Sequence, residues 1–132
     1  MADRMFHSEK GALEIDRVEL FAEITFGAAG AVDSFTAKGT SNIALEGTST
    51  YKISLEDSYY KLLAADTIWL EADALDPASV GNAVKIESED VNSSSDPHLK
   101  ITTTKSSDGT DTIPADGSKL YVTIKLRNSS VD

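Results

Sequence analysis

Pairs of acidic residues a few positions apart are the first side chains in this chain that offer chemistry. Two carboxylates at a suitable separation can act as the acid and base of a glycosidase, or can ligate calcium. Three such pairs occur, namely Asp73 with Asp76, Glu87 with Asp90, and Asp108 with Asp111. With 22 acidic residues among 132, pairs of this kind arise by chance. The last pair resembles a calcium loop but lacks the EF-hand spacing, so we expect neither catalysis nor a metal site from them.

Histidines and nucleophiles give no stronger signal. His7 and His98 are isolated in the sequence, and neither belongs to an HxH or HExxH pattern. The chain has no cysteine and no GxSxG motif, and the sequence GAAGAVDSF at 27–35 lacks the lysine of a phosphate-binding loop. We therefore predict that the protein is not an enzyme, that it has no catalytic residues, and that it binds no cofactor or metal.

The aromatic residues allow two interpretations. Trp69 and the tyrosines at 51, 59, 60 and 121 are candidates for a platform on which sugar rings stack. Aromatic side chains in strands more often fill a core or a protein interface, because they bury a large apolar area. We favour core or subunit contacts, and keep carbohydrate binding as the alternative.

The charge of the chain narrows the choice of partners. The formal net charge is −10, and residues 53–96 alone carry 2 basic and 10 acidic groups, a net of −8. Such a surface is repelled by phosphate backbones, so we expect no nucleic acid partner. No apolar run approaches the roughly 20 residues that span a bilayer, so we expect no membrane partner. The absence of cysteine is compatible with folding in a reducing cytosol.

The predicted secondary structure consists mostly of short strands. Apolar and polar residues alternate, as in half-buried strands, over 18–26, 51–55, 67–74 and 119–127. Weaker or shorter strands are predicted at 31–38, 41–46, 83–88 and 98–104. A short helix is predicted after Asp57 or Ser58, because Tyr59, Leu62 and Leu63 have the spacing i, i+3, i+4. Many short strands separated by turn residues, with one short helix, predict an all-β protein built as a two-sheet β-sandwich or jelly roll.

The same alternation predicts which residues are buried. The inward set comprises Ile24, Ile53, Leu55, Leu70, Val122 and Ile124. Phe21 and Tyr121 interrupt polar strand faces, so we predict that they form a subunit interface. Residues 1–17 show no period and are expected to form an N-terminal arm, which precedes a single domain at 18–132. Because the arm carries the apolar residues Met5, Phe6, Leu13 and Ile15, we predict that these side chains bind a partner surface.

The order of these parts resembles a known family. The matching residues are Arg4-Met5-Phe6, Ala12-Leu13-Glu14, ITFGAAGAVDSFTAKG at 24–39, TYKISLEDSYYKLLAAD at 50–66 and DTIPADGSKLYVTIKLRNS at 111–129. In these segments, which cover most of the chain, the sequence is similar to small virion structural proteins of tailed bacteriophages. The motifs are structural, and they carry no catalytic residues.

The resemblance implies a role as a capsid decoration, or cement, protein. Such a protein binds the lattice of the major capsid protein and stabilises the head, so it is expected on the capsid surface of the virion after synthesis in the host cytoplasm. A homo-oligomer is expected, with a trimer favoured. The alternatives are another virion part, such as a head fibre base or a tail component, and a carbohydrate-binding module displayed on the virion.

Overall fold

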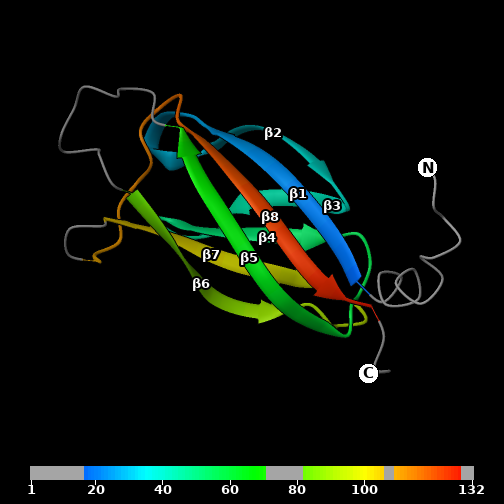
Figure 1. The fold of residues 1–132 in the computed structure, drawn as a ribbon. Coiled ribbons are helices and arrows are strands. Elements are labelled where there is room, and N and C mark those ends of the chain that lie inside the picture. The colour runs from blue at the N-terminus through cyan, green and yellow to red at the C-terminus, as the bar shows by residue number, and fades with distance from the viewer. Residues whose placement is uncertain (1–16, 71–81, 106–108, 129–132) are drawn as a thin grey trace, which may run out of the picture.

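Two four-stranded antiparallel sheets face one another as a sandwich in the computed structural model, which describes residues 17–70, 82–105 and 109–128 (Figure 1). The first sheet has the strand order β2-β1-β8-β5, with bounds Val32–Lys38, Arg17–Phe26, Lys119–Arg127 and Lys61–Leu70. The second sheet has the order β3-β4-β7-β6, with bounds Thr40–Leu45, Thr50–Leu55, His98–Lys105 and Asn82–Asp90. The predicted all-β sandwich is confirmed. No helix within the described residues is long and apolar enough to cross a membrane.

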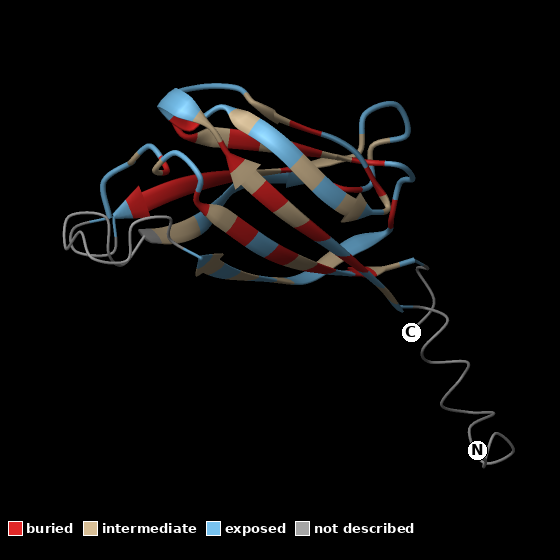
Figure 2. Cartoon of the chain, turned by 90° about the horizontal axis from the view of Figure 1, so that it is seen from above, coloured by how far each residue is buried: buried red, intermediate tan, exposed pale blue. Residues whose placement is uncertain are grey.

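Alternating side chains explain why these segments form strands and where the core lies. Along β8, Leu120, Val122, Ile124 and Leu126 are all buried, and the residues between them face outward (Figure 2). β8 lies between β1 and β5, as the strength of its alternation predicts for a central strand. The sequence also placed β1 and its antiparallel neighbour β2 correctly, and the turn between them contains a short 3-10 segment, Ala28–Gly30.

The predicted core is correct at five of six positions. Ile24, Ile53, Leu55, Val122 and Ile124 are buried between the sheets. The prediction that Leu70 faces inward is wrong. Leu70 is 53% exposed and lies on the outer face of the first sheet. The residue before it, Trp69, packs against the core instead.

The predicted helix after Asp57 is also wrong, because backbone hydrogen bonds to distant parts of the chain hold this segment. The Tyr59 amide donates to the carbonyl of Val91, in the turn after β6, at 2.7 Å, and the Tyr60 amide donates to the carbonyl of Arg127, on β8, at 2.8 Å. β5 begins at the next residue, Lys61. A register shift between Leu62 and Ala64 then inserts one extra residue opposite β8.

That bulge explains why Leu70 faces outward. Before it, Leu62 faces Leu126 and packs against the core. After it, the even-numbered residues face outward, so Ile68 and Leu70 are exposed. One extra residue reverses the side-chain phase of a strand.

Several sequence predictions fall on segments that the structure does not describe. These are the arm residues Met5, Phe6, Leu13 and Ile15, together with His7, Asp73, Asp76 and Asp108, which lie outside the described residues. The described chain begins at Arg17, which is already the first residue of β1.

Candidate docking face

The outer face of the first sheet carries a group of exposed apolar side chains, which we call the docking face. Its members are Phe21 on β1, Tyr121 on β8, and Ile68 and Leu70 on β5, which are 51%, 40%, 70% and 53% exposed. Tyr121 lies directly opposite Ile68 across the β8–β5 ladder, and Leu70 lies two residues along the same strand. Phe21 is a diagonal neighbour of Tyr121, because it pairs with Thr123. Diagonal neighbours on one sheet face are about 7–8 Å apart, within reach of aromatic side chains.

The sequence predicted half of this face. Phe21 and Tyr121 were predicted to form a subunit interface because each interrupts a polar strand face. In the structure they lie together on one surface. Ile68 and Leu70 were missed, because the alternation over 67–74 places them on one strand face and Leu70 was predicted to face inward. The bulge in β5 turns them outward. The signal that could have found it is the adjacent pair Leu62-Leu63, where strict alternation already fails.

Charged side chains surround the docking face and are paired with one another. Lys119 Nζ lies 3.0 Å from Glu23 Oε1, on the neighbouring strand. This hydrogen bond, followed by the attraction of the Glu23 charge, raises the pKa of Lys119 above its ordinary value. Lys125 Nζ lies 3.9 Å from Asp66 Oδ2. An apolar centre with a polar rim is the usual composition of a protein–protein contact.

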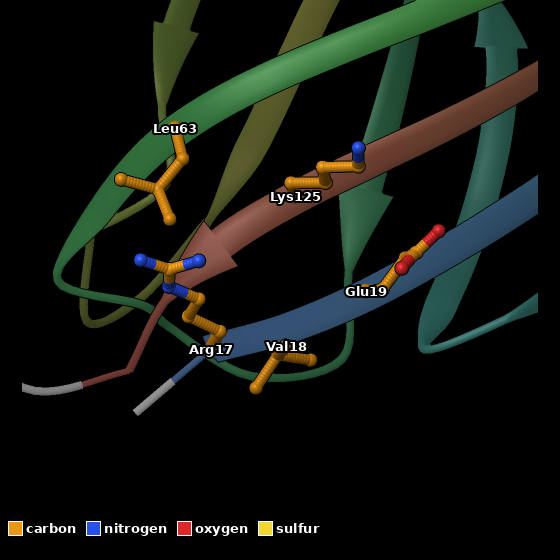
Figure 3. Close-up of a pocket in the computed structure, with 5 residues that line it drawn as sticks. All are labelled: Arg17, Val18, Glu19, Leu63 and Lys125. Carbon is orange, nitrogen blue, oxygen red and sulfur yellow. The ribbon is translucent and has the colours of Figure 1, made fainter. Parts of the chain in front are cut away.

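A hollow of about 590 Å³ lies at the end of this sheet where β1 begins and β8 ends (Figure 3). It is lined by Arg17, Val18, Glu19, Leu63 and Lys125. The lining therefore combines two cations, one carboxylate and two apolar side chains. These five residues include no pair of carboxylates and no Ser, Cys or His, so the lining shows none of the common pairings of a nucleophile with a base.

The outer face of the second sheet is different, because none of the exposed large apolar residues lies on its central strands β4 and β7, and lysines on these strands form ion pairs. Lys52 Nζ lies 2.7 Å from Asp96 Oδ2, and Lys100 Nζ lies 2.9 Å from Glu46 Oε2. The hydrogen bond from Lys52 lowers the pKa of Asp96, and the hydrogen bond from Lys100 lowers the pKa of Glu46. Exposed pairs of this kind contribute little stability. They do, however, make this face suited to water, whereas the docking face is not.

Glu87, His98 and Asp111, the candidates for chemistry whose contacts the structure describes, do not form a metal or catalytic cluster. Glu87 accepts a hydrogen bond of 3.1 Å from the Thr102 hydroxyl, and Lys85 lies 3.8 Å from Glu87 and 3.9 Å from Asp111. The Nδ1 atom of His98 lies 2.7 Å from the backbone carbonyl of Asp96. Across the described ranges, no three His, Asp or Glu side chains are close enough to hold a metal ion.

The aromatic side chains are mostly committed to the core. Tyr51 and Tyr59 are buried, and the ring of Trp69 packs 5.5 Å from the ring of Phe26. Tyr60 is exposed, with the Arg127 guanidinium 5.9 Å from its ring centre. A sugar-stacking platform built on Trp69 therefore loses its main residue.

Comparison with known proteins adds no family to this geometry. No family model matches the chain, and neither the curated proteins nor the solved structures contain a significant match. The resemblance to phage virion proteins, carried by 24–39, 50–66 and 111–129, therefore stays a prediction.

Proposed function

We propose that the protein is a non-enzymatic decoration, or cement, protein that binds the major capsid protein lattice of a tailed phage head. The observation that supports an assembling role is the difference between the two outer faces of the sandwich. The outer face of the second sheet carries the ion pairs Lys52–Asp96 and Lys100–Glu46. The outer face of the first sheet exposes Phe21, Tyr121, Ile68 and Leu70 together. Contiguous exposed apolar residues with a polar rim are typical of surfaces that contact another protein.

In this proposal, one surface of the protein binds other copies of the chain and another binds the capsid. The docking face, with Phe21 and Tyr121, contacts other copies of the chain, and three copies form the oligomer. The arm, with Met5, Phe6, Leu13 and Ile15, contacts the capsid. An arm of this kind covers much surface when it orders on binding, at a cost in entropy.

Stabilisation of the head then follows from mass action. A ligand that binds the assembled lattice and not the dissociated subunits stabilises the lattice by linkage. An oligomer that presents several arms at once remains bound longer than a single copy, because each further contact is intramolecular.

The first experiment mixes the purified protein with empty expanded heads and measures how much sediments with them. Saturation at a fixed ratio to the major capsid protein, with density at regular lattice positions in an electron microscopy map, is expected. Binding to tails and not to heads would assign the protein to the tail, and no binding to either would remove the virion proposal.

The second experiment separates the arm from the domain. Deletion of residues 1–13 is expected to leave the melting temperature unchanged and to abolish binding to heads. A truncated protein that folds and still occupies heads fully would show that the arm is not the anchor.

For the docking face, Phe21→Ser with Tyr121→Ser should give monomers. The matched control, Asn42→Ala with Ser88→Ala, changes two exposed residues of the second sheet and should leave the oligomer intact.

A further inference from the structure

The four edge strands of the sandwich are not equally protected against pairing with another chain. In the second sheet, β3 has only six residues and a bulge, and β6 has a bulge and carries Glu87, Glu89 and Asp90. Short length, bulges and charge are the usual means of blocking an edge. In the first sheet, β2 and β5 also contain a bulge each, but Ser34–Lys38 of β2 and Ala64–Leu70 of β5 are in uninterrupted register with their neighbours, and each stretch carries a single charged residue, Lys38 or Asp66.

These two stretches lie on opposite edges of the same sheet. Among the described residues, β2 pairs with β1 alone and β5 pairs with β8 alone, so each leaves one side of its backbone without a ladder. The strands alternate in direction across the sheet, so β5 of one copy and β2 of another are antiparallel when the sheets are placed side by side in the same orientation. A continuous sheet across two copies therefore keeps the antiparallel pattern.

The rows of paired residues show why the two edges match. One row on the outer face runs Lys38, Phe21, Thr123, Asp66 from β2 to β5. It begins with a cation and ends with a carboxylate, and both end residues are exposed. Asp66 also lies 3.9 Å from Lys125 of its own copy, but an exposed pair of this length is weak and leaves the carboxylate accessible to a second cation. When the row continues into a second copy, Asp66 faces Lys38 of that copy. Opposite charges directly across an antiparallel pair are favourable, whereas like charges are unfavourable.

The next row favours the same register. It runs Thr36, Glu23, Tyr121, Ile68, so its continuation places the exposed Ile68 beside Thr36 of the second copy. A Thr next to an Ile suits a β-sheet surface, since both side chains are β-branched. In this register Ile68, the most exposed large apolar residue described, gains a neighbour and loses contact with water.

We propose that copies of this chain join head to tail, with β5 of one copy pairing antiparallel to β2 of the next, and with Asp66 opposite Lys38. The contact uses two different edges, so it is heterologous, and it closes into a ring when the rotation between copies permits. A ring whose docking faces turn toward the axis also brings Phe21 and Tyr121 of the copies together. The inference needs a homo-oligomer but does not depend on the capsid proposal.

Disulfide trapping tests the pairing directly, because the chain contains no cysteine. Residues directly opposite in an antiparallel pair have Cα atoms about 4.5–5.5 Å apart, within the range that a disulfide bridges. Ile68→Cys protein and Thr36→Cys protein, mixed and oxidised, should give a covalent dimer that contains one of each. Each variant alone should remain monomeric on a denaturing gel. The control mixture of Ile68→Cys with Asn42→Cys, on an edge of the second sheet, should not cross-link.

Other outcomes of this trapping experiment overturn the proposal. Cross-linking of Ile68→Cys with itself would show that two β5 strands pair as a symmetric dimer. Equal cross-linking in the Asn42→Cys control would show random collision. No cross-link in any mixture, with all variants folded by their melting temperatures, would show that these edges do not meet.

Charge reversal is a second, independent measurement. Asp66→Lys and Lys38→Asp should each weaken association about fivefold, because each puts like charges opposite one another. The double variant carrying both changes restores an opposite pair in every contact, and it should regain the association of the unmodified chain. A double variant as weak as the sum of the two single variants would rule out the pairing. A chain that pairs in this way yet fails to bind heads would remove the capsid proposal and leave this one standing.

Discussion

The hydroxyl of Tyr51, on β4 of the second sheet, donates a hydrogen bond of 2.5 Å to the carbonyl of Gly30, in the turn that follows β1 of the first sheet. Both residues are buried, and the Tyr51 ring lies 5.1 Å from the ring of Phe26. The Tyr51 side chain therefore fills the core and also binds the backbone of the turn at Ala28–Gly30, which belongs to the opposite sheet.

Tyr51→Phe should lower the free energy of unfolding by about 1–3 kcal/mol, because it leaves the buried Gly30 carbonyl without this donor. Urea denaturation measures the change. Tyr60→Phe is the matched control, since Tyr60 is exposed, and it should change the value by less than about 0.5 kcal/mol. Equal effects of the two substitutions would mean that the Tyr51 hydrogen bond contributes nothing measurable.

The same tyrosine predicts a loss of stability at high pH. Burial raises the pKa of Tyr51 to about 12, from an unfolded value near 10. The folded protein therefore holds this proton more tightly than the unfolded chain. The contribution is fully present below pH 10 and is lost as the pH rises through 12. Melting temperatures between pH 9 and 12 should fall more steeply for the natural chain than for Tyr51→Phe, and parallel curves would contradict the assignment.

Truncation of two aliphatic residues should lower the free energy of unfolding by very different amounts. Ile124 is fully buried at the centre of β8, so Ile124→Ala should cost about 2–5 kcal/mol. Leu70→Ala should cost less than about 0.5 kcal/mol, because Leu70 lies on the outer face. Denaturant midpoints of the monomeric protein give both values. A large loss at Leu70 would mean that its side chain is covered in solution.

A glycine between the sheets should be sensitive to a single methyl group. Gly39 joins β2 to β3 with a φ of +80°, and a Cβ there would collide with the Leu20 side chain. Gly109 has a similar φ of +74°, with nothing within 4 Å of an added Cβ. Gly109→Ala should therefore cost about 1–2 kcal/mol from backbone strain alone. Gly39→Ala should cost a further 1–3 kcal/mol or so from overpacking, and equal losses would show that Leu20 moves away freely.

Removal of metal ions should not change the protein. The sequence offers no ligand set with recognised spacing, so a chelator is expected to leave the melting temperature unchanged. A lower melting temperature in EDTA that calcium restores would contradict this, and it would point to Asp108 and Asp111. Asp111→Asn would then be expected to abolish the response to calcium.

Strands with an unbroken apolar face could be predicted from the sequence alone. In β1 and β8 every second residue is apolar from Val18 to Phe26 and from Leu120 to Leu126, and in a sandwich only one orientation of such a strand buries that face. Ile24, Val122 and Ile124 could therefore be assigned to the core before any fold was known. Phe21 and Tyr121 could be recognised as exposed for the same reason.

The orientation of β5 and the neighbours of each exposed residue depend on contacts between distant strands. The bulge near Leu63 is fixed by pairing with β8, a partner far away in the chain, and no local pattern requires it. The register between strands likewise depends on which strands become neighbours. It sets Ile68 beside Tyr121, and it gives the row from Lys38 to Asp66 its opposite charges. A local pattern gives the direction of each side chain along its own strand, whereas contacts between distant strands decide which side chains form a surface together.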